Sequence, residues 1–125
     1  MLKLFQCERC GNIATLVKDS GVPLVCCGKP MVLLVPNTVD AAVEKHTPVI
    51  SAEGSVVTVD VGSAPHPMTE EHLIDWVILV TQHGVQRAIM AATDEPKAVF
   101  HLCPCDSPVV AYAYCNLHGV WQADA

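Results

Sequence analysis

The sequence predicts an all-β protein in which a small cysteine-rich part precedes a larger antiparallel β-sandwich. Three observations predict this fold class. Four of the seven cysteines lie close to the N-terminus. From about residue 38, short runs rich in valine and isoleucine alternate with turn residues, as strands of a sandwich do. No stretch has a convincing helical period. A chain of 125 residues holds one ordinary domain, or a small domain with an appendage.

The first part, residues 1–36, has a pair of cysteines near each end. Cys7 and Cys10 form a C-x-x-C knuckle, and the adjacent Cys26 and Cys27 close the unit. Chains below roughly 40 residues bury too little apolar surface to fold unaided and need a staple or a partner subunit. Four thiolates around one metal ion would supply that staple.

The second part, residues 37–125, is expected to be an immunoglobulin-like antiparallel β-sandwich. Pro36–Thr38 breaks the pattern of the first part and marks the boundary. Gly54-Ser55 and His83-Gly84 are predicted hairpin turns, the second of them resembling the Asn-Gly type. The spacing indicates about seven short strands. The clearest runs are Val56–Val61, Leu73–Thr81, Val85–Ala92, Ala98–Leu102, Val109–Tyr114 and Val120–Trp121.

Composition excludes several classes of function. The formal net charge is −6 with only seven basic residues, which argues against nucleic-acid binding. The longest apolar run, Leu73–Val80, is interrupted by Asp75 and is far shorter than the ~18–20 residues of a membrane span. The N-terminus does not resemble a signal peptide. We therefore expect a soluble cytoplasmic protein, in which seven cysteines indicate metal or redox chemistry rather than disulfides.

The four N-terminal cysteines have the pattern of a tetrahedral metal site. Two close thiolates, a gap of fifteen residues and two more thiolates fit such a site. Zinc ribbons usually separate the second pair by two residues, whereas Cys26 and Cys27 are adjacent. Spacing alone leaves a structural zinc ion and an electron-carrying mononuclear iron ion equally open.

A second candidate metal site begins near the C-terminus, at Cys115 and His118. These residues are three positions apart in a tight turn, so one loop can offer a metal a soft and a borderline ligand. His46, His66 and His72 each lie near a proline or acidic residues in the middle of the chain. We expect the scaffold to bring these three imidazoles to the turn.

Both constellations resemble the desulfoferrodoxin family, the two-iron form of superoxide reductase. The first resembles its desulforedoxin-type iron centre, and the likeness extends over nearly all of the chain. The segments that carry it are Cys26-Cys27-Gly28-Lys29-Pro30-Met31, Glu44-Lys45-His46-Thr47-Pro48, Pro65-His66-Pro67-Met68, Glu71-His72 and Tyr114-Cys115-Asn116-Leu117-His118-Gly119. Five such segments in the family's order make the resemblance specific.

The resemblance implies two mononuclear iron ions per chain and a superoxide reductase activity. It assigns Cys7, Cys10, Cys26 and Cys27 to the first iron, and His46, His66, His72, His118 and Cys115 to the second. The four imidazoles would lie in one plane, with His118 binding through Nδ1 and the others through Nε2. The thiolate would be axial.

Two residues next to a ligand histidine complete the expected site. Lys45 would attract the superoxide anion and orient a proton-donating water. Glu44 would close the position opposite the thiolate once the iron is oxidised. The enzyme would reduce superoxide by one electron to hydrogen peroxide without producing dioxygen, as a defence against oxidative stress. The resemblance also implies a rubredoxin-type electron donor and a homodimer.

Two other functions stay open on the residues alone. A zinc-bound structural or regulatory module would use the four N-terminal cysteines and leave the histidines without a shared purpose. A rubredoxin-like electron carrier would have an inert sandwich. Cys103 and Cys105 lie outside the family pattern and are expected to be free thiols, with a redox-sensing disulfide or an adventitious metal site as alternatives. His83 and His101 are expected to be surface or packing residues.

Overall fold

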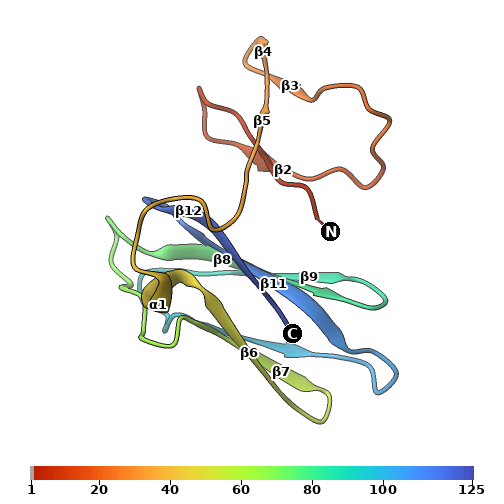
Figure 1. The fold of residues 1–125 in the computed structure, drawn as a ribbon, viewed down its shortest axis with the longest axis vertical. Helices are drawn as coiled ribbons and strands as arrows, with labels where there is room; N and C mark the ends of the chain where they lie inside the picture. Colours follow the sequence, from red (N-terminus) through yellow and green to blue (C-terminus); the bar gives the residue numbers. More distant parts are fainter. Residues whose placement is uncertain (1) are drawn as a thin grey trace. The chain divides into compact units, whose positions relative to one another are not determined.

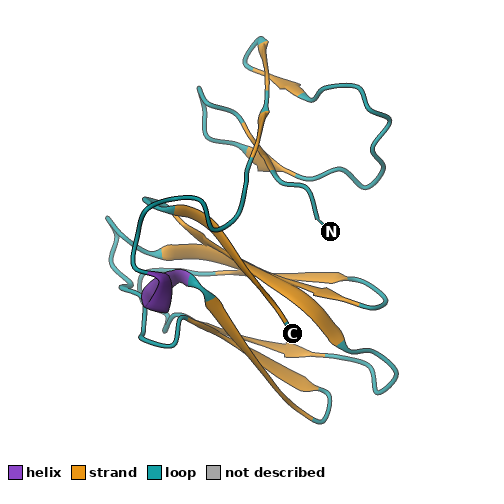
Figure 2. Cartoon of the chain, in the orientation of Figure 1, coloured by secondary structure: helices purple, strands orange, loops and turns teal. Residues whose placement is uncertain are grey.

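The computed structural model describes residues 2–125, and the chain divides between Val35 and Pro36 into two compact units. Met1, where the first expected domain begins, lies outside the described residues. Strands make up nearly all of the regular structure, and one helical turn is the exception within residues 2–125 (Figure 2). The all-β prediction is confirmed. No helix in the described chain has the length and apolar character needed to cross a membrane.

The first unit is built from strands of two residues each. The central strand β1 pairs with β2 on one side and with β5 on the other, and both pairings are antiparallel. A separate hairpin joins β3 and β4. The bounds are β1 Phe5–Gln6, β2 Ile13–Ala14, β3 Val25–Cys26, β4 Lys29–Pro30 and β5 Val32–Leu33.

The hairpin between β3 and β4 explains how two adjacent cysteines can serve one site. Cys26 pairs with Lys29, so Cys27 and Gly28 form a two-residue loop. Both loop residues have positive φ, 53° at Cys27 and 74° at Gly28, as a type I′ turn requires. Glycine adopts this conformation without strain. The turn therefore places Cys26 on a strand and Cys27 on the tight loop that follows.

The second unit is a sandwich of a three-stranded and a four-stranded antiparallel sheet (Figure 1). The first sheet has the order β10-β7-β6 and the second has the order β12-β11-β8-β9. The bounds are β6 Pro48–Glu53, β7 Val56–Val61, β8 Ile74–Thr81, β9 Val85–Ile89, β10 Lys97–His101, β11 Pro108–Cys115 and β12 Gly119–Asp124. Seven strands in two sheets confirm the predicted sandwich.

The core of this unit lies between the two sheets. Along β7 every second residue is fully buried, namely Val57, Val59 and Val61. Val77 and Leu79 of β8 and the alanines of β11 belong to the same apolar cluster. Burying a valine or leucine side chain stabilises a fold by roughly 1.5–3 kcal/mol. Cys115, the candidate ligand at the end of β11, belongs to the same cluster.

A helical turn, α1 (Val43–His46), was missed by the sequence analysis, which found no helical period. Four residues are too few to show a period, and no side chain caps the N-terminus of the turn. Tertiary contacts hold it. The carbonyl oxygen of Glu44 accepts hydrogen bonds from the N–H of Ala64 at 2.9 Å and the hydroxyl of Ser63 at 3.3 Å.

Two further details differ from the sequence analysis. β6 was not among the expected runs, although it forms the predicted hairpin with β7 across Gly54 and Ser55. The turn between β8 and β9 is centred on Gln82 and His83, one residue earlier than expected, because the N–H of Thr81 donates to the carbonyl of Gly84 at 2.9 Å. The threonine hydroxyl makes a second link to the same oxygen at 3.2 Å. The predicted hairpin between β8 and β9 forms, but His83-Gly84 does not adopt the Asn-Gly conformation, because neither residue has a positive φ.

Gly62 allows the close approach between α1 and the segment that follows β7. A Cβ atom built at this position would lie 2.5 Å from the carbonyl oxygen of Glu44 and 3.0 Å from that of Thr47. Both are backbone atoms, so neither can move aside without shifting α1. A side chain at residue 62 would therefore push away the helix that carries His46.

We expect Gly62→Ala to destabilise the second unit by about 1–3 kcal/mol, the usual cost of overpacking. Thermal unfolding measures the loss. Gly84→Ala is the matched control, because a Cβ there meets nothing within 4 Å. Equal unfolding temperatures for the two variants would contradict the close-approach argument.

Candidate metal centres

The four N-terminal cysteines converge in the first unit and are here called the cysteine site. The sulfur atoms of Cys7, Cys10, Cys26 and Cys27 all lie within 4.8 Å of one another. Cys10 Sγ is 3.6 Å from Cys26 Sγ, which is 4.0 Å from Cys27 Sγ. A tetrahedron with metal–sulfur bonds of ~2.3 Å has an edge of about 3.8 Å. The four thiols therefore fit one tetrahedral metal ion.

Backbone amides prepare the first pair of thiols for this role. The N–H of Cys10 donates to Cys7 Sγ at 3.4 Å, and the N–H of Asn12 donates to Cys10 Sγ at 3.5 Å. Hydrogen bonds from the backbone of Cys10 and Arg9 lower the pKa of Cys7 to about 6. This end of the site is thus biased toward the thiolate that binds metals.

The second pair has the opposite bias. Hydrogen bonding with the thiols of Cys10, Cys7 and Cys26 raises the pKa of Cys27 to about 12. Four thiolates this close repel one another, and a cation at their centre relieves the repulsion. The difference between the lowered pKa of Cys7 and the raised pKa of Cys27 follows from the hydrogen bonds among four thiols that lie close together.

Four histidines and one cysteine converge in the second unit and are here called the histidine site. It contains His46, His66, His72, Cys115 and His118. The ring centroids of consecutive neighbours are 4.7, 4.6, 5.2 and 4.9 Å apart in the order His46–His66–His72–His118–His46. The diagonal from His46 to His72 is 6.5 Å. The four imidazoles therefore form a square array.

The ring nitrogen atoms are spaced as ligands of one ion. His46 Nε2 lies 3.1 Å from His118 Nδ1 and 3.2 Å from His66 Nε2. Metal–nitrogen bonds of ~2.1 Å give adjacent corners of a square about 3 Å apart. Cys115 Sγ is 3.7 Å from His118 Nδ1 and within 4.8 Å of the ligand nitrogens of the other three. The sulfur is thus close to the axis of the square.

Hydrogen bonds on the outer side of the rings fix which nitrogen faces inward. His46 Nδ1 lies 2.7 Å from the carbonyl of Ala42, and His66 Nδ1 lies 2.7 Å from the carbonyl of Pro67. A carbonyl only accepts, so both Nδ1 atoms carry the proton and both Nε2 atoms present lone pairs. His72 Nε2 is buried without a hydrogen-bond partner. Inward lone pairs at 3.2 Å repel unless a cation lies between them, so the site fits a metal ion.

Burial favours the neutral form of the buried groups, which for an imidazole is the form that binds a cation. Desolvation, together with the three neighbouring imidazoles, lowers the pKa of His66 to about 4, although the hydrogen bond to the carbonyl of Pro67 opposes the shift. The pKa of His72 is lowered by burial and by the positive charges of its neighbours, Lys45 among them. Burial raises the pKa of the Cys115 thiol, while the backbone N–H groups of Leu117 and His118 oppose this by hydrogen bonding.

The ligands come from four segments that neighbouring residues tie together. Asn116 donates from Nδ2 to the carbonyl of Glu71 at 2.9 Å and accepts from the N–H of Leu73 at 3.0 Å. The loop that carries His72 is thereby fastened to the turn after Cys115. Trp121 Nε1 donates to the carbonyl of His118 at 3.1 Å. The tryptophan ring also packs against His46, with a centroid distance of 5.0 Å. The sequence analysis gave neither residue a specific role at this site.

The remaining candidate residues are exposed at the surface of the second unit. Glu44 and Lys45 are exposed on α1, directly before His46, and form no ion pair within residues 2–125. His83 and His101 are exposed and belong to neither metal site.

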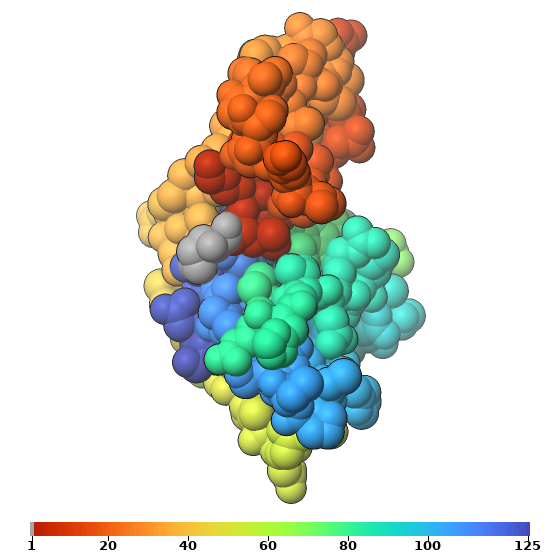
Figure 3. Space-filling view, turned by 90° about the vertical axis from the view of Figure 1, so that its right-hand side faces the viewer, coloured from red at the N-terminus to blue at the C-terminus, as the bar shows by residue number. Residues whose placement is uncertain are grey.

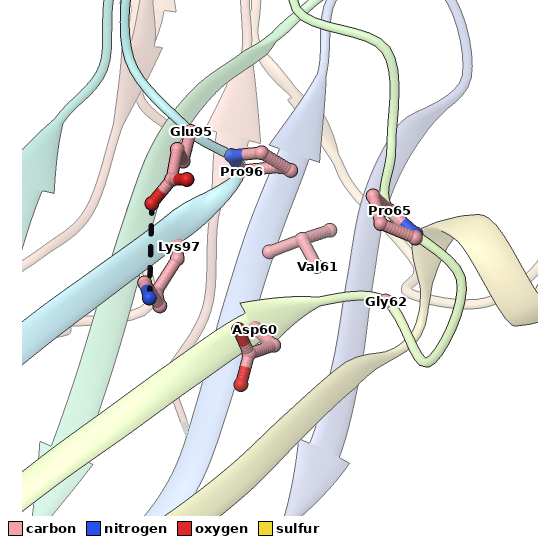
Figure 4. A pocket seen from close by; sticks show the side chains of 7 residues that line it. All are labelled: Asp60, Val61, Gly62, Pro65, Glu95, Pro96 and Lys97. Atoms are coloured by element: carbon pink, nitrogen blue, oxygen red, sulfur yellow. Dashed lines mark ion pairs between the residues drawn. The ribbon is translucent and has the colours of Figure 1, made fainter.

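A surface hollow of about 190 Å³ lies beside Gly62 (Figure 4). The residues that line it are Asp60, Val61, Gly62, Pro65, Glu95, Pro96 and Lys97. None of them is a candidate ligand, and two of its three charged residues, Glu95 and Lys97, pair with each other at 3.7 Å. The hollow carries no sign of the chemistry described above.

A sandwich with a separate thiolate site and a four-histidine, one-cysteine site defines a two-centre metalloprotein. The sequence profile described as desulfoferrodoxin matches residues 38–124, and the profile of the desulfoferrodoxin N-terminal domain matches residues 1–34. The chain therefore belongs to the desulfoferrodoxin family, as the motifs predicted.

Individual relatives agree with this assignment. A desulfoferrodoxin of Syntrophotalea carbinolica is 45% identical over 123 residues, which cover 98% of this chain and 96% of the relative. The crystal structure of the superoxide reductase from Treponema pallidum superposes with a TM-score of 0.85 at 37% identity and covers 99% of both chains. A superoxide reductase of Pyrococcus horikoshii is 36% identical over 96 residues, 63% of this chain and 84% of the relative.

We expect Asn116→Ala to weaken metal binding at the histidine site by about 10–100-fold, as loss of an outer hydrogen-bonding partner typically does. Zn²⁺ titration of metal-free protein, followed by the imidazole NMR signals, measures the affinity. Gln86→Ala is the control, since its side-chain amide also bonds a backbone carbonyl, that of His101. Equal affinities in both variants would rule out a positioning role for Asn116.

Proposed function

We propose that this protein is a superoxide reductase with one mononuclear iron ion at the cysteine site and another at the histidine site. The square of four imidazoles with the buried Cys115 thiol near its axis carries the proposal. Ferrous iron at the histidine site would supply one electron to superoxide, and two protons would complete hydrogen peroxide. The proposed ligands are those of the two sites as defined above.

The chemistry of the donor set favours this function over a structural zinc site. Neutral imidazoles add no negative charge around the ion, so the site does not repel an incoming anion as carboxylates would. A structural zinc site has four ligands and is closed. This site offers five, namely four imidazole nitrogens in a square and one sulfur near its axis. His72 and His118 are half-buried, whereas His46 and His66 are buried, so one edge of the square reaches solvent.

Charge makes Lys45 the residue that guides the substrate. Residues 36–125 contain three basic and eleven acidic side chains, a formal charge of 3 − 11 = −8 with neutral histidines. A field of this sign repels superoxide. Lys45 is exposed beside the site, and its charge acts on His72. It would attract the anion locally and hold a water molecule that donates a proton.

We assign Glu44 the position opposite Cys115 in the oxidised protein. Its carboxylate is exposed and lies two residues from His46 on α1. Its backbone carbonyl is already fixed to the segment before His66 by Ser63 and Ala64. Only the side chain is therefore free to move toward the site.

The domain assignment and the partners complete the proposal. Residues 1–36 would be a desulforedoxin-like, rubredoxin-type iron domain and residues 37–125 the catalytic sandwich. The first unit leaves large apolar side chains exposed, among them Val17, Val22, Val25 and Val35. A homodimer that covers them would stabilise so small a unit, and sedimentation of the full chain tests it. The electron donor would be a rubredoxin-type protein in the cytoplasm.

The stoichiometry of the reaction tests the function. Iron-loaded, pre-reduced protein should yield one hydrogen peroxide per superoxide consumed and no dioxygen. A dismutase would yield one peroxide per two superoxide anions, together with dioxygen, and that result would overturn the proposal. Zinc-loaded protein serves as the control and should leave superoxide to decay at its spontaneous rate of dismutation.

We expect Lys45→Ala to slow the reaction with superoxide by roughly tenfold or more, because the local attraction is lost and the negative field remains. The rate of the native protein should fall as salt rises, whereas the rate of the variant should stay level or increase. Pulse radiolysis at several ionic strengths measures both.

A matched lysine variant serves as the control for this experiment. Lys97→Ala removes the same charge from the same unit at a residue paired with Glu95 and should keep the native rate.

Glu44→Ala should keep the first step fast and shift the absorption band of the oxidised protein. A native rate for Lys45→Ala would remove this residue from the mechanism, and an unmoved band would remove Glu44.

A further inference from the structure

Two of the seven cysteines, Cys103 and Cys105, belong to neither metal site. Both are exposed free thiols in the β10–β11 connection and form no disulfide. They flank Pro104 in a β-turn, which is closed by a hydrogen bond from the N–H of Asp106 to the carbonyl of Cys103 at 2.9 Å. Proline is favoured at this second position of a turn because its ring fixes φ.

The turn is anchored on both sides. Before it, Leu102 is buried, and its N–H donates to the carbonyl of Ser55 at 2.8 Å. After it, the carboxylate of Asp106 accepts from the hydroxyl of Thr81 at 2.7 Å and from the N–H of Ser107 at 2.9 Å. Only the three residues Cys103–Cys105 lie between these anchors. A change confined to them leaves the core undisturbed.

A neighbouring loop holds this turn at the surface. The N–H of His83 donates to the Asp106 carboxylate at 3.2 Å, and the N–H of Gln82 donates to the carbonyl of Ser107 at 3.0 Å. In Figure 3 the blue β10–β11 connection and the teal β8–β9 connection lie side by side at the surface of the second unit. Dissolved small molecules can therefore reach both thiols.

The surroundings favour thiol chemistry over metal binding. Within residues 2–125, side chains that could hold a metal gather in groups of three or more only at the two sites already described. Cys103 and Cys105 belong to neither group. The nearest carboxylate, that of Asp106, is occupied by three hydrogen bonds, which lower its pKa. The geometry thus offers two thiols and no further donor.

We propose that Cys103 and Cys105 form a dithiol that hydrogen peroxide oxidises reversibly to a disulfide. One thiol attacks peroxide and becomes a sulfenic acid, releasing water. The second thiol attacks that sulfur, closes the S–S bond and releases another water. The two thiols lose two electrons and two protons, and one peroxide becomes two waters. The source of the peroxide rests on the proposed function.

The turn suits both closure and reopening of this bond. Disulfides need Cα atoms about 4.4–6.8 Å apart, and a β-turn keeps even its first and fourth Cα atoms within ~7 Å. The resulting ring spans only three residues and is exposed. Strained or exposed disulfides have more oxidising potentials and are readily reduced. A cellular dithiol would restore the two thiols while itself becoming a disulfide.

The dithiol acts independently of the histidine site. β11 runs from Pro108, beside the cysteine turn, to Cys115, a proposed ligand. Eight residues of strand separate the two ends by about 24 Å. Oxidation of the pair therefore leaves the ligands in place, and the two events have separate readouts.

The test adds hydrogen peroxide directly to the iron-loaded full chain, so that it does not depend on superoxide chemistry. After denaturation, alkylation and digestion, the peptide with Cys103 and Cys105 should be two hydrogens lighter and should lack the alkyl groups. Dithiothreitol treatment before alkylation should restore both groups. Cys103→Ser should stop at a sulfenic acid on Cys105, which dimedone traps, while its rate with superoxide stays native.

Three results would overturn the proposal. One is a pair that stays reduced under peroxide. Another is oxidation directly to sulfinic or sulfonic acid without the disulfide. The third is a third metal ion per chain that protects both thiols and is lost in Cys103→Ser. If added peroxide forms the disulfide but the pre-reduced protein releases dioxygen from superoxide, the dithiol proposal stands and the proposed function fails.

Discussion

The histidine site is organised by the repulsion between ring lone pairs that face one another. Hydrogen bonds to the carbonyls of Ala42 and Pro67 put the protons of His46 and His66 on the outside. Their inner nitrogen atoms, 3.2 Å apart, then have no proton to share. The fold accepts this unfavourable arrangement because the sandwich around it is rigid. A cation turns the same arrangement into a favourable one, so metal binding contributes directly to stability.

The scaffold controls the site through backbone contacts rather than through the ligands themselves. α1 approaches the segment after β7 closely because residue 62 has no side chain. Asn116 fastens the His72 loop to the turn after Cys115 with two hydrogen bonds. Trp121 holds the carbonyl of His118 and packs on His46. These contacts fix the outer side of each ligand, while the inner side stays free for the ion.

The sequence predicted the sandwich because valine-rich alternation is a local signal. Its resemblance to a known family supplied the full set of nine candidate ligands. It missed α1, whose four residues are held by Ser63 and Ala64 rather than by a helical pattern. It also missed the role of Asn116, since its partners are more than forty residues away. The turn between Thr81 and Gly84 was placed one residue too late, because the bond from the N–H of Gly84 to the Thr81 hydroxyl leaves no signal in the His83-Gly84 pair. Interactions that depend on tertiary contact leave no local pattern to read.

The two units also differ in charge, and this difference bears on how each is used. The first contains four basic and two acidic residues, a formal charge of 4 − 2 = +2 that leaves the thiolates uncounted, whereas the second has −8. Four thiolates around an iron ion add negative charge to the first unit, so its lysines and arginine offset the cluster. A metal cation at the histidine site would add positive charge to the second unit, and Lys45 would extend it toward solvent. An anion approaching the histidine site would thus meet a local field that attracts it, against the negative charge of the unit as a whole.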